Sequence, residues 1–137
     1  MKLIIGGYAQ GRLSYALKKY HLTERDVLDL NFKNLKKFEN PDFWKDWKEK
    51  KIIYHMEHFV TVCLKNQQDI LQEIQKKLPD CQNKIIITQE VGCGLVPIDP
   101  KERQWREAVG RMNQLLAEYA ESVERVCCGL GMYLKLA

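Results

Sequence analysis

The chain has 137 residues, the length of one domain and enough to bury a hydrophobic core. Its composition, 45% hydrophobic and 29% charged, is ordinary for a globular protein, and no apolar run approaches the length that spans a membrane. The apolar residues that open the chain are too few for a signal peptide, so we expect a cytoplasmic protein without a membrane partner. The net charge of +4 suits an anionic ligand such as a nucleotide but does not indicate binding to nucleic acid.

The five cysteines lack the spacing of a metal site, and we expect no bound metal. They are Cys63, Cys81, Cys93, Cys127 and Cys128. In a cytoplasmic protein we expect them to be reduced and mostly buried thiols. Cys127 and Cys128 are adjacent within a predicted strand, so their side chains would point to opposite faces of a sheet.

A glycine turn follows the first predicted strand. Leu3 to Ile5 is typical of a buried strand, the sequence Gly6-Gly7-Tyr8-Ala9-Gln10-Gly11 comes next, and a helix is predicted from there to Lys18 or Tyr20. The separation of Gly6 from Gly11 is that of a phosphate-binding loop, Gly-x-x-x-x-Gly-Lys-Ser/Thr. Backbone N–H groups of such a loop and the N-terminus of the following helix can hold an anion.

Two side chains depart from this loop pattern. Arg12 replaces the lysine; it keeps the charge, but its forked guanidinium does not reproduce the geometry of an ammonium group on the phosphates. Leu13 replaces the hydroxyl residue that binds magnesium, which argues against a magnesium ion. Ser14 lies one residue further on and points about 100° away. The alternative is a glycine turn that binds nothing.

The segment up to Lys51 is less informative. Asp26 to Phe32 is predicted as the second strand. The lysines after it, Lys33, Lys36 and Lys37, form a solvated loop or, alternatively, a phosphate-binding patch. Pro41 to Lys50 is predicted as a short helix whose aromatic residues belong to the core or a subunit interface, or stack on a nucleobase or corrin ring. These residues are Phe43, Trp44 and Trp47.

Lys51 to Asn66 fits either a strand or a helix. We predict a strand to about His55 and a helix beyond it, because an α/β sheet needs a central strand here. His55 and His58 are surface or capped core histidines, or else phosphate ligands or acid–base groups, since imidazole titrates near neutral pH. Asp69 to Leu78 is then predicted as a helix that ends at Pro79.

The last third of the chain has the clearest pattern. Ile85 to Thr88 is predicted as a buried strand, and Glu90 follows at its carboxyl end, where ligands bind in open α/β sheets. A long amphipathic helix is predicted after it, with Asp99 as N-cap, Pro100 as first residue and Glu102 completing a capping box.

Inside this helix Gly110 would allow close approach of another backbone or a ligand. Val123 to Cys128 and Met132 to Leu136 are predicted as two strands, joined by a turn at Gly129 to Gly131.

The most specific signal is a set of residues spread over the stretch from Lys84 to Lys135. They are Glu90-Val91-Gly92, Gly94, Val96-Pro97, Arg103, Arg106-Glu107, Gly110-Arg111, Asn113-Gln114, Gly129, Gly131 and Lys135. Their spacing resembles the carboxyl half of the CobU family, the bifunctional adenosylcobinamide kinases and adenosylcobinamide-phosphate guanylyltransferases of cobalamin synthesis. The resemblance is much weaker before Lys84, except at the glycine turn, where the family has Gly-Gly-x-x-x-Gly-Lys-Ser.

The resemblance implies an α/β fold, P-loop NTPase-like (RecA-like), in which helices flank a mostly parallel sheet and residues 1–137 form a single domain. It implies GTP or ATP as the nucleotide, adenosylcobinamide or another corrinoid as a partner, and a homo-oligomer, by resemblance a trimer. The residues it places at the nucleotide are Gly6, Gly7, Gly11, Arg12, Glu90, Arg103, Arg106 and Arg111. The arginines of the long helix would form a phosphate clamp or, equally, a salt-bridged interface.

Two departures from the family bear on activity. The family's third strand ends in a glutamate that assists the metal and phosphate site, and His55, Met56 or Glu57 occupies the equivalent place here. The family's guanylyl-accepting histidine follows its second strand, and this chain has no matching segment, since His21 lies before that strand. The hypotheses are therefore a kinase without guanylyltransferase activity, a relative that binds nucleotide or corrinoid without catalysis, and an oligomeric structural partner without a small ligand.

Overall fold

The computed structural model describes residues 1–31, 38–91 and 96–136. They build a six-stranded sheet with the strand order β2-β3-β4-β1-β5-β6. The strands are β1 (Lys2–Gly6), β2 (Val27–Asp29), β3 (Ile52–Tyr54), β4 (Ile85–Gln89), β5 (Ser122–Cys127) and β6 (Leu130–Lys135). All neighbouring pairs are parallel except β5 and β6, which form an antiparallel hairpin. The predicted mostly parallel α/β sheet is confirmed.

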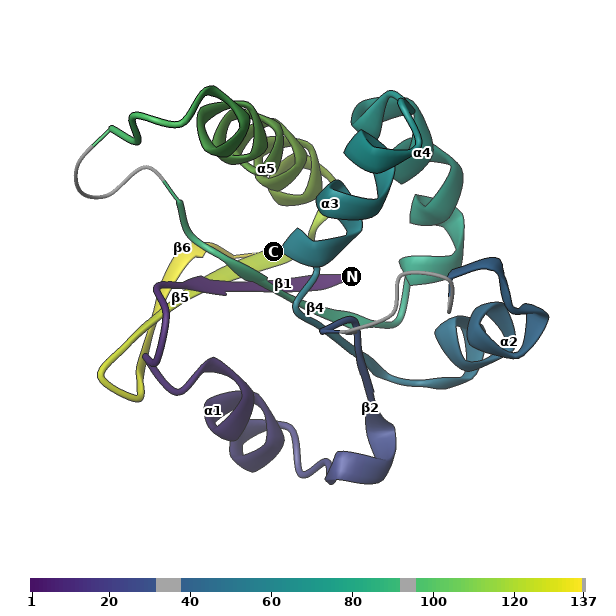
Figure 1. The fold of residues 1–137 in the computed structure, drawn as a ribbon. Helices are drawn as coiled ribbons and strands as arrows, with labels where there is room; N and C mark the ends of the chain where they lie inside the picture. Colours follow the sequence, from purple (N-terminus) through teal and green to yellow (C-terminus); the bar gives the residue numbers. More distant parts are fainter. Residues whose placement is uncertain (32–37, 92–95, 137) are drawn as a thin grey trace.

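Helices cover both faces of this sheet (Figure 1). On one face lies α1 (Arg12–Lys19), and on the other lie α3 (Glu57–Lys65), α4 (Ile70–Lys77) and α5 (Pro100–Tyr119). The remaining elements are α2 (Pro41–Glu49) and the short turns η1 (Glu24–Asp26) and η3 (Leu78–Cys81). Alternate strand residues supply the two cores: Leu3 and Ile86 pack toward α3 and α5, whereas Ile4 packs toward α1.

The helix starts follow from their capping residues. Asp99 accepts a hydrogen bond of 2.9 Å from the N–H of Lys101, and Pro100 is the first residue of α5, as predicted. Glu102 lies 3.6 Å from Arg106 in an ion pair along the helix. Asp69 caps α4 in the same way as Asp99 caps α5. The predicted change from strand to helix after His55 is also confirmed, since β3 ends at Tyr54 and α3 begins at Glu57.

The aromatic cluster of α2 belongs to the hydrophobic core. Phe43 and Trp47 are buried and pack with Phe59 of α3. Trp44 is half-buried, its Nε1–H donates to the carbonyl of Phe38, and the Lys77 ammonium lies 3.6 Å from its ring centre. The cluster therefore stabilises the packing of α2 on the sheet, the first of the two predicted alternatives.

Three predicted boundaries were wrong. Strand β2 is shorter than Asp26 to Phe32, because Asp26 belongs to η1, where its carboxylate accepts a hydrogen bond from the N–H of Thr23. Strand β6 begins at Leu130, and Cys128 lies in the turn before it, since its φ of 53° is incompatible with a strand. Phe32, Lys33, Lys36 and Lys37 lie outside the described residues.

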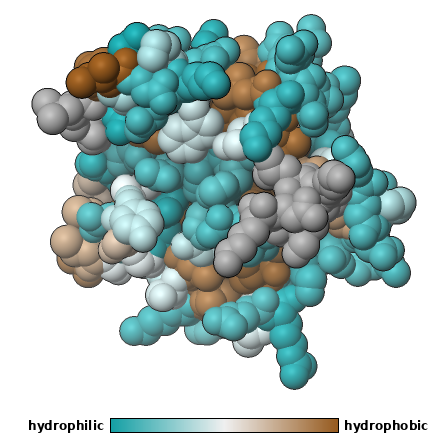
Figure 2. Space-filling model, in the orientation of Figure 1, coloured by the Kyte–Doolittle hydropathy of each residue, from teal (hydrophilic) through white to brown (hydrophobic). Residues whose placement is uncertain are grey.

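The surface seen in Figure 2 is mostly hydrophilic, with separate apolar areas. All residues of the edge strand β6 are exposed, among them Met132 at 55% and Leu134 at 55%. Across the described ranges, no helix combines the length and apolar character needed to cross a bilayer.

Candidate functional site

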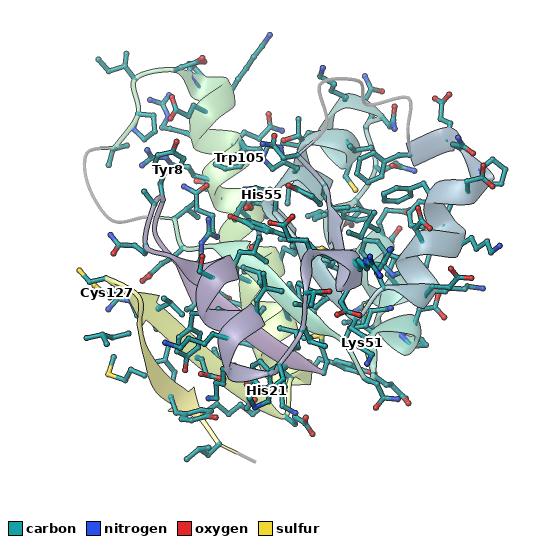
Figure 3. The ribbon with its side chains drawn as sticks, turned by 90° about the horizontal axis from the view of Figure 1, so that it is seen from below. Tyr8, His21, Lys51, His55, Trp105 and Cys127 are labelled. Atoms are coloured by element: carbon teal, nitrogen blue, oxygen red, sulfur yellow. The ribbon has the colours of Figure 1, made fainter. Side chains whose placement is uncertain are left out.

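The carboxyl ends of the parallel strands meet at one edge of the sheet. From β2 across to β5, this edge carries Asp29, the segment 55–57, Glu90, the turn 6–12 and Arg125. In Figure 3 the labelled Tyr8, His55 and Cys127 lie toward this edge, while His21 and Lys51 lie at the opposite end. Open α/β sheets bind their ligands at the carboxyl edge, so these residues define the candidate site.

The glycine turn has the backbone conformation that its glycines permit. Gly11 has a φ of 82° and immediately precedes α1, whose N-terminus receives no side-chain cap. A Cβ atom at Gly6 would lie 2.7 Å from the carbonyl oxygen of Val126 and 3.1 Å from the side-chain stem of Arg12. Glycine at position 6 therefore allows β5 and the Arg12 stem to approach β1 closely.

The turn of the β5–β6 hairpin is bonded to the glycine turn. The Oε1 of Gln10 accepts a hydrogen bond of 2.7 Å from the N–H of Cys128. The backbone carbonyl of Gln10 accepts a second one, of 2.9 Å, from the N–H of Gly129. These two bonds join segments more than a hundred residues apart and fix the position of the glycine turn.

Arg12 and Glu57 form a buried charge pair behind the turn. Arg12 is 5% exposed and Glu57 is 1% exposed, and Nη1 of Arg12 lies 3.9 Å from Oε1 of Glu57, too far for a hydrogen bond. Neither this Nη1 nor either carboxylate oxygen of Glu57 has a hydrogen-bond partner within the described part of the chain. Burial raises the pKa of Glu57 above its ordinary value, although the charge of Arg12 acts in the opposite direction.

The three residues at the family's glutamate position have different neighbours in the structure. Glu57, the first residue of α3, is the one whose carboxylate lies beside Arg12. Met56 is buried in the core, and His55 pairs with Asp29.

A second polar group lies beside the charge pair. Nδ1 of His55 is 2.6 Å from Oδ1 of Asp29, and the ring of His55 stacks on Tyr54 at 3.7 Å between centres. Burial opposes ionisation of Asp29, yet the hydrogen bond with His55 holds the pKa of Asp29 below its ordinary value. Burial and the neighbouring His55 lower the pKa of His58, so its imidazole is neutral near pH 7. Tyr54 connects this group to Arg12, whose guanidinium carbon lies 6.0 Å from the tyrosine ring centre.

Glu90 lies on the other side of the glycine turn. Its Oε2 accepts a hydrogen bond of 2.9 Å from Nε of Arg125. Both side chains line a small cavity of about 190 Å³ together with Gly7 and Gln10. The structure therefore brings Glu90 to the glycine turn, where its N–H donates to the carbonyl of Gly6 at 2.7 Å, and adds Arg125, which the sequence pattern did not indicate.

The arginines of α5 lie on the sheet face opposite α1 (Figure 1). Arg103 donates to the carbonyls of Pro97 and Ile98, at 3.0 and 3.1 Å. Arg106 and Arg111 each lie within ion-pair distance of a glutamate one turn earlier on α5. The contacts of these three arginines thus lie within α5 and the segment just before it, and Arg106 and Arg111 line a groove with Val91, the residue after Glu90.

Gly110 has no second backbone against it among the described residues, where a Cβ atom would meet no atom within 4 Å. The close approach of a ligand, the other predicted alternative, stays a prediction. Gly110 lies in an open groove of about 460 Å³ with Val91, Arg106 and Arg111.

Two structural polar groups were not predicted from the sequence. Asn113 accepts a hydrogen bond from the Thr88 hydroxyl and donates to the Gln89 carbonyl, both at 3.0 Å, which ties α5 to the carboxyl end of β4. Glu124 of β5 is buried, and it receives hydrogen bonds from Tyr15, Lys19 and Tyr20 of the α1 segment. The available signal for Glu124 was a charged residue between the apolar residues of a predicted strand, next to Arg125.

The cysteine prediction was partly wrong. Cys63 and Cys81 are buried free thiols, but Cys127 and Cys128 are exposed, and Cys93 lies outside the described residues, as do Gly92 and Gly94. In the portions of the chain described, no three side chains of the metal-binding types are grouped as a metal site. Leu13 packs, half-buried, against the core under α1.

Comparison with known proteins places the chain in a family. The model of the family described as "Cobinamide kinase / cobinamide phosphate guanyltransferase", CobU, matches residues 44–134. The chain belongs to the CobU family. With the sheet described above, membership confirms the predicted P-loop NTPase-like fold. The match begins after the glycine turn. The interpretation of this turn as a phosphate-binding loop therefore depends on its sequence pattern and on the geometry of residues 6–12.

Two curated relatives carry the name "Bifunctional adenosylcobalamin biosynthesis protein CobU". The protein of Escherichia coli (strain K12) is 38% identical over 73 residues, and that of Salmonella typhimurium (strain LT2) is 37% identical over 73 residues. Each match covers 50% of this chain and 40% of the relative. The matched region therefore spans less than half the length of these curated relatives.

Proposed function

We propose that this CobU-family chain acts in cobalamin biosynthesis and binds the phosphates of GTP or ATP at its glycine turn. The observation that carries this proposal is the buried Nη1 of Arg12, which has no hydrogen-bond partner among the described residues. The stem of the same side chain packs against Gly6 of the turn. A phosphate oxygen would accept a charge-assisted hydrogen bond from this group. The uncapped N-terminus of α1 supplies further N–H donors in the same place.

The carboxyl edge carries further groups that suit a nucleotide or its acceptor. Glu90 and Arg125 line the cavity next to Gly7. Tyr54 and His55 present a stacked ring pair near Arg12, against which a flat ligand, such as a purine base, can pack. The corrinoid partner, adenosylcobinamide, enters the proposal through family membership.

A second candidate function is phosphoryl transfer from the nucleotide to adenosylcobinamide. Glu57 supports it, because it is one of the three residues that the resemblance offers for the glutamate of the phosphate site, and its carboxylate lies 3.9 Å from Arg12. The residues present do not supply the full magnesium ligand set of a phosphate-binding loop, since position 13 is a leucine packed against the core. We therefore derive no transfer step, and nucleotide binding is the primary proposal.

Calorimetry with GTP and with ATP, each with and without Mg²⁺, tests the proposal on the wild type, Arg12→Ala and Lys76→Ala. Lys76 is a matched control, because it is an exposed cation on α4 that pairs with Glu73. A hydrogen bond to a charged group is worth about 1.5–3 kcal/mol, so Arg12→Ala should weaken binding at least about tenfold, and Lys76→Ala should leave it unchanged.

Absence of binding at millimolar nucleotide, or equal binding by wild type and Arg12→Ala, would refute the proposed site. Binding that requires Mg²⁺, together with transfer of the γ-phosphate to adenosylcobinamide, would establish the kinase. The trimer implied by the resemblance is a separate proposal, which light scattering of the purified chain tests directly.

A further inference from the structure

Two exposed thiols stand side by side at the tip of the β5–β6 hairpin. Cys127 ends β5 and Cys128 begins the turn, and both are free and exposed. Their sulfur atoms are 4.0 Å apart. The site lies at the end of the molecule where Figure 3 labels Cys127, toward the carboxyl edge.

The turn conformation does not explain a cysteine at position 128. Cys128 and Gly129 have φ values of 53° and 75°, so both central residues of this two-residue hairpin are left-handed. Such a turn favours asparagine, aspartate or glycine at its first central position. A cysteine in the left-handed region is strained, and strain of this kind is a reason to look for a chemical role.

Cys127 and Cys128 are also the most accessible thiols among the described residues. Burial raises the pKa of Cys63 to about 12 and that of Cys81 to about 11, so neither buried thiol forms a thiolate readily. Thiol oxidation proceeds through the thiolate and requires access to the sulfur. An oxidant in solution therefore reaches Cys127 and Cys128 before the two buried thiols.

We propose that Cys127 and Cys128 form a reversible dithiol–disulfide site that controls the contact between the hairpin turn and the glycine turn. With a low-molecular-weight disulfide as oxidant, the Cys127 thiolate attacks one sulfur, forms a mixed disulfide and displaces the first thiol. Cys128, as it loses its proton, then attacks the Cys127 sulfur, forms the Cys127–Cys128 bond and displaces the second thiol. The oxidant accepts two electrons in total, and both cysteine protons end on its thiols.

The bond changes the backbone because the two residues are adjacent. Neighbouring Cα atoms are about 3.8 Å apart, which is closer than the usual separation of about 4.4–6.8 Å between disulfide-bonded residues. Ring closure therefore rotates the peptide between Cys127 and Cys128. The N–H of this peptide is the group that donates to Oε1 of Gln10, so oxidation breaks that hydrogen bond and loosens the glycine turn.

This inference goes beyond the proposed function and does not depend on nucleotide binding. It depends on the position of Gln10, which the two hydrogen bonds from the hairpin turn hold. A chain that binds no nucleotide at all would still show the oxidation and the change at Gln10.

The test uses the full chain with Cys93→Ser in every protein, treated with oxidised glutathione and then with dithiothreitol. Trypsin releases Val126–Lys135, which contains both hairpin cysteines and no other. We expect this peptide to become lighter by two hydrogen atoms in a monomeric chain, and the change to reverse with dithiothreitol. By NMR, hydrogen exchange of the Cys128 amide should accelerate at least about tenfold on oxidation, since it loses its acceptor.

Cys128→Asn is the matched control, because asparagine is favoured at this turn position and keeps the same backbone N–H. Its amide exchange should be equal with and without the oxidant. The proposal fails if the wild type gives only mixed or intermolecular disulfides. It also fails if the intramolecular disulfide forms while exchange at Cys128 stays unchanged.

Discussion

Replacing Glu57 by glutamine is expected to leave the protein at least as stable as the wild type at neutral pH, even though it removes one member of an ion pair. The carboxylate is 1% exposed and its two oxygens receive no hydrogen bond from the described residues. Glutamine has the same shape but no charge. The substitution therefore separates the value of the charge from the value of the packing.

The magnitude follows from the distance between the charges. At 3.9 Å and an effective dielectric constant of about 20, the attraction between Arg12 and Glu57 is about 4 kcal/mol. Removing the Glu57 carboxylate from water costs several kcal/mol, and without hydrogen bonds to it from the described residues, the attraction to Arg12 does not recover this amount. The raised pKa of Glu57 also indicates that the folded protein favours a neutral side chain at this position, because the effect of burial outweighs the charge of Arg12. We expect Glu57→Gln to increase the free energy of unfolding by about 1 kcal/mol at neutral pH, because the relief of the buried carboxylate exceeds the loss of its attraction to Arg12.

The pH dependence gives an independent check of the sign. Since the folded-state pKa of Glu57 lies above its ordinary value of 4.5, folding favours the protonated carboxyl. The stability associated with this preference is complete below pH 4.5 and is lost as the pH rises through the folded-state pKa. Glutamine does not titrate, so the variant and the wild type should be nearly equal in acid and diverge toward neutral pH.

Urea unfolding followed by tryptophan fluorescence measures this difference, because Trp47 is buried in the core and reports its exposure. Glu73→Gln is the control, since Glu73 pairs with the exposed Lys76 and should change stability by no more than about 0.5 kcal/mol. A loss of about 3 kcal/mol or more in Glu57→Gln at neutral pH would refute the reasoning. The ion pair would then stabilise the protein, and the charge of Arg12 would already be satisfied by Glu57 without an anion.

Two further substitutions test the packing around the glycine turn. Gly6→Ala places a Cβ 2.7 Å from the Val126 carbonyl and should destabilise the protein by about 1–3 kcal/mol, seen as a lower thermal midpoint; an unchanged midpoint would contradict the close approach. Tyr20→Phe removes a hydroxyl 2.5 Å from the buried Glu124 and should cost about 1–3 kcal/mol, whereas Tyr119→Phe on the surface of α5 should cost nothing. Burial would raise the pKa of Glu124, but hydrogen bonds from Lys19, Tyr15 and Tyr20 hold it below 4.5. The stability that these hydrogen bonds contribute is therefore present above that pH and lost as the pH falls. An equal cost of Tyr20→Phe in acid would contradict this.

The elements predicted well are those whose signals are local. The apolar run from Ile85 and the Asp99–Pro100 start of α5 each depend on a few neighbouring residues, and both were confirmed. The boundary at Cys128 was wrong because Cys128 and Gly129 are the two left-handed central residues of a two-residue hairpin turn. Cysteine is not one of the residues that mark such a turn in a sequence, so the apolar pattern continued the strand through it.

The site was predictable only in its local part. The spacing of Gly6 and Gly11 is readable from the sequence, and the structure adds a left-handed Gly11 at the start of α1. The pairing of Asp29 with His55 depends on the register of β2 on β3, which places Asp29 opposite Tyr54. The contact of Glu57 with Arg12 likewise depends on where β3 ends and α3 begins, a boundary that the ambiguous pattern of Lys51 to Asn66 left open.

Leu13→Ser tests whether the altered glycine turn still has the geometry of a magnesium-binding loop. Serine restores the hydroxyl that the pattern requires, while Leu13→Ala is the matched control, since both variants lose the same contacts with the core under α1. If residue 13 faces the phosphates of a bound nucleotide, we expect Mg²⁺ to increase the GTP or ATP affinity of Leu13→Ser at least about tenfold relative to Leu13→Ala, measured by calorimetry. Equal affinities of the two variants with Mg²⁺ would show that the turn does not place a hydroxyl at the metal. Charge neutralisation would then fall to Arg12, whose counter-charge in the free protein is Glu57.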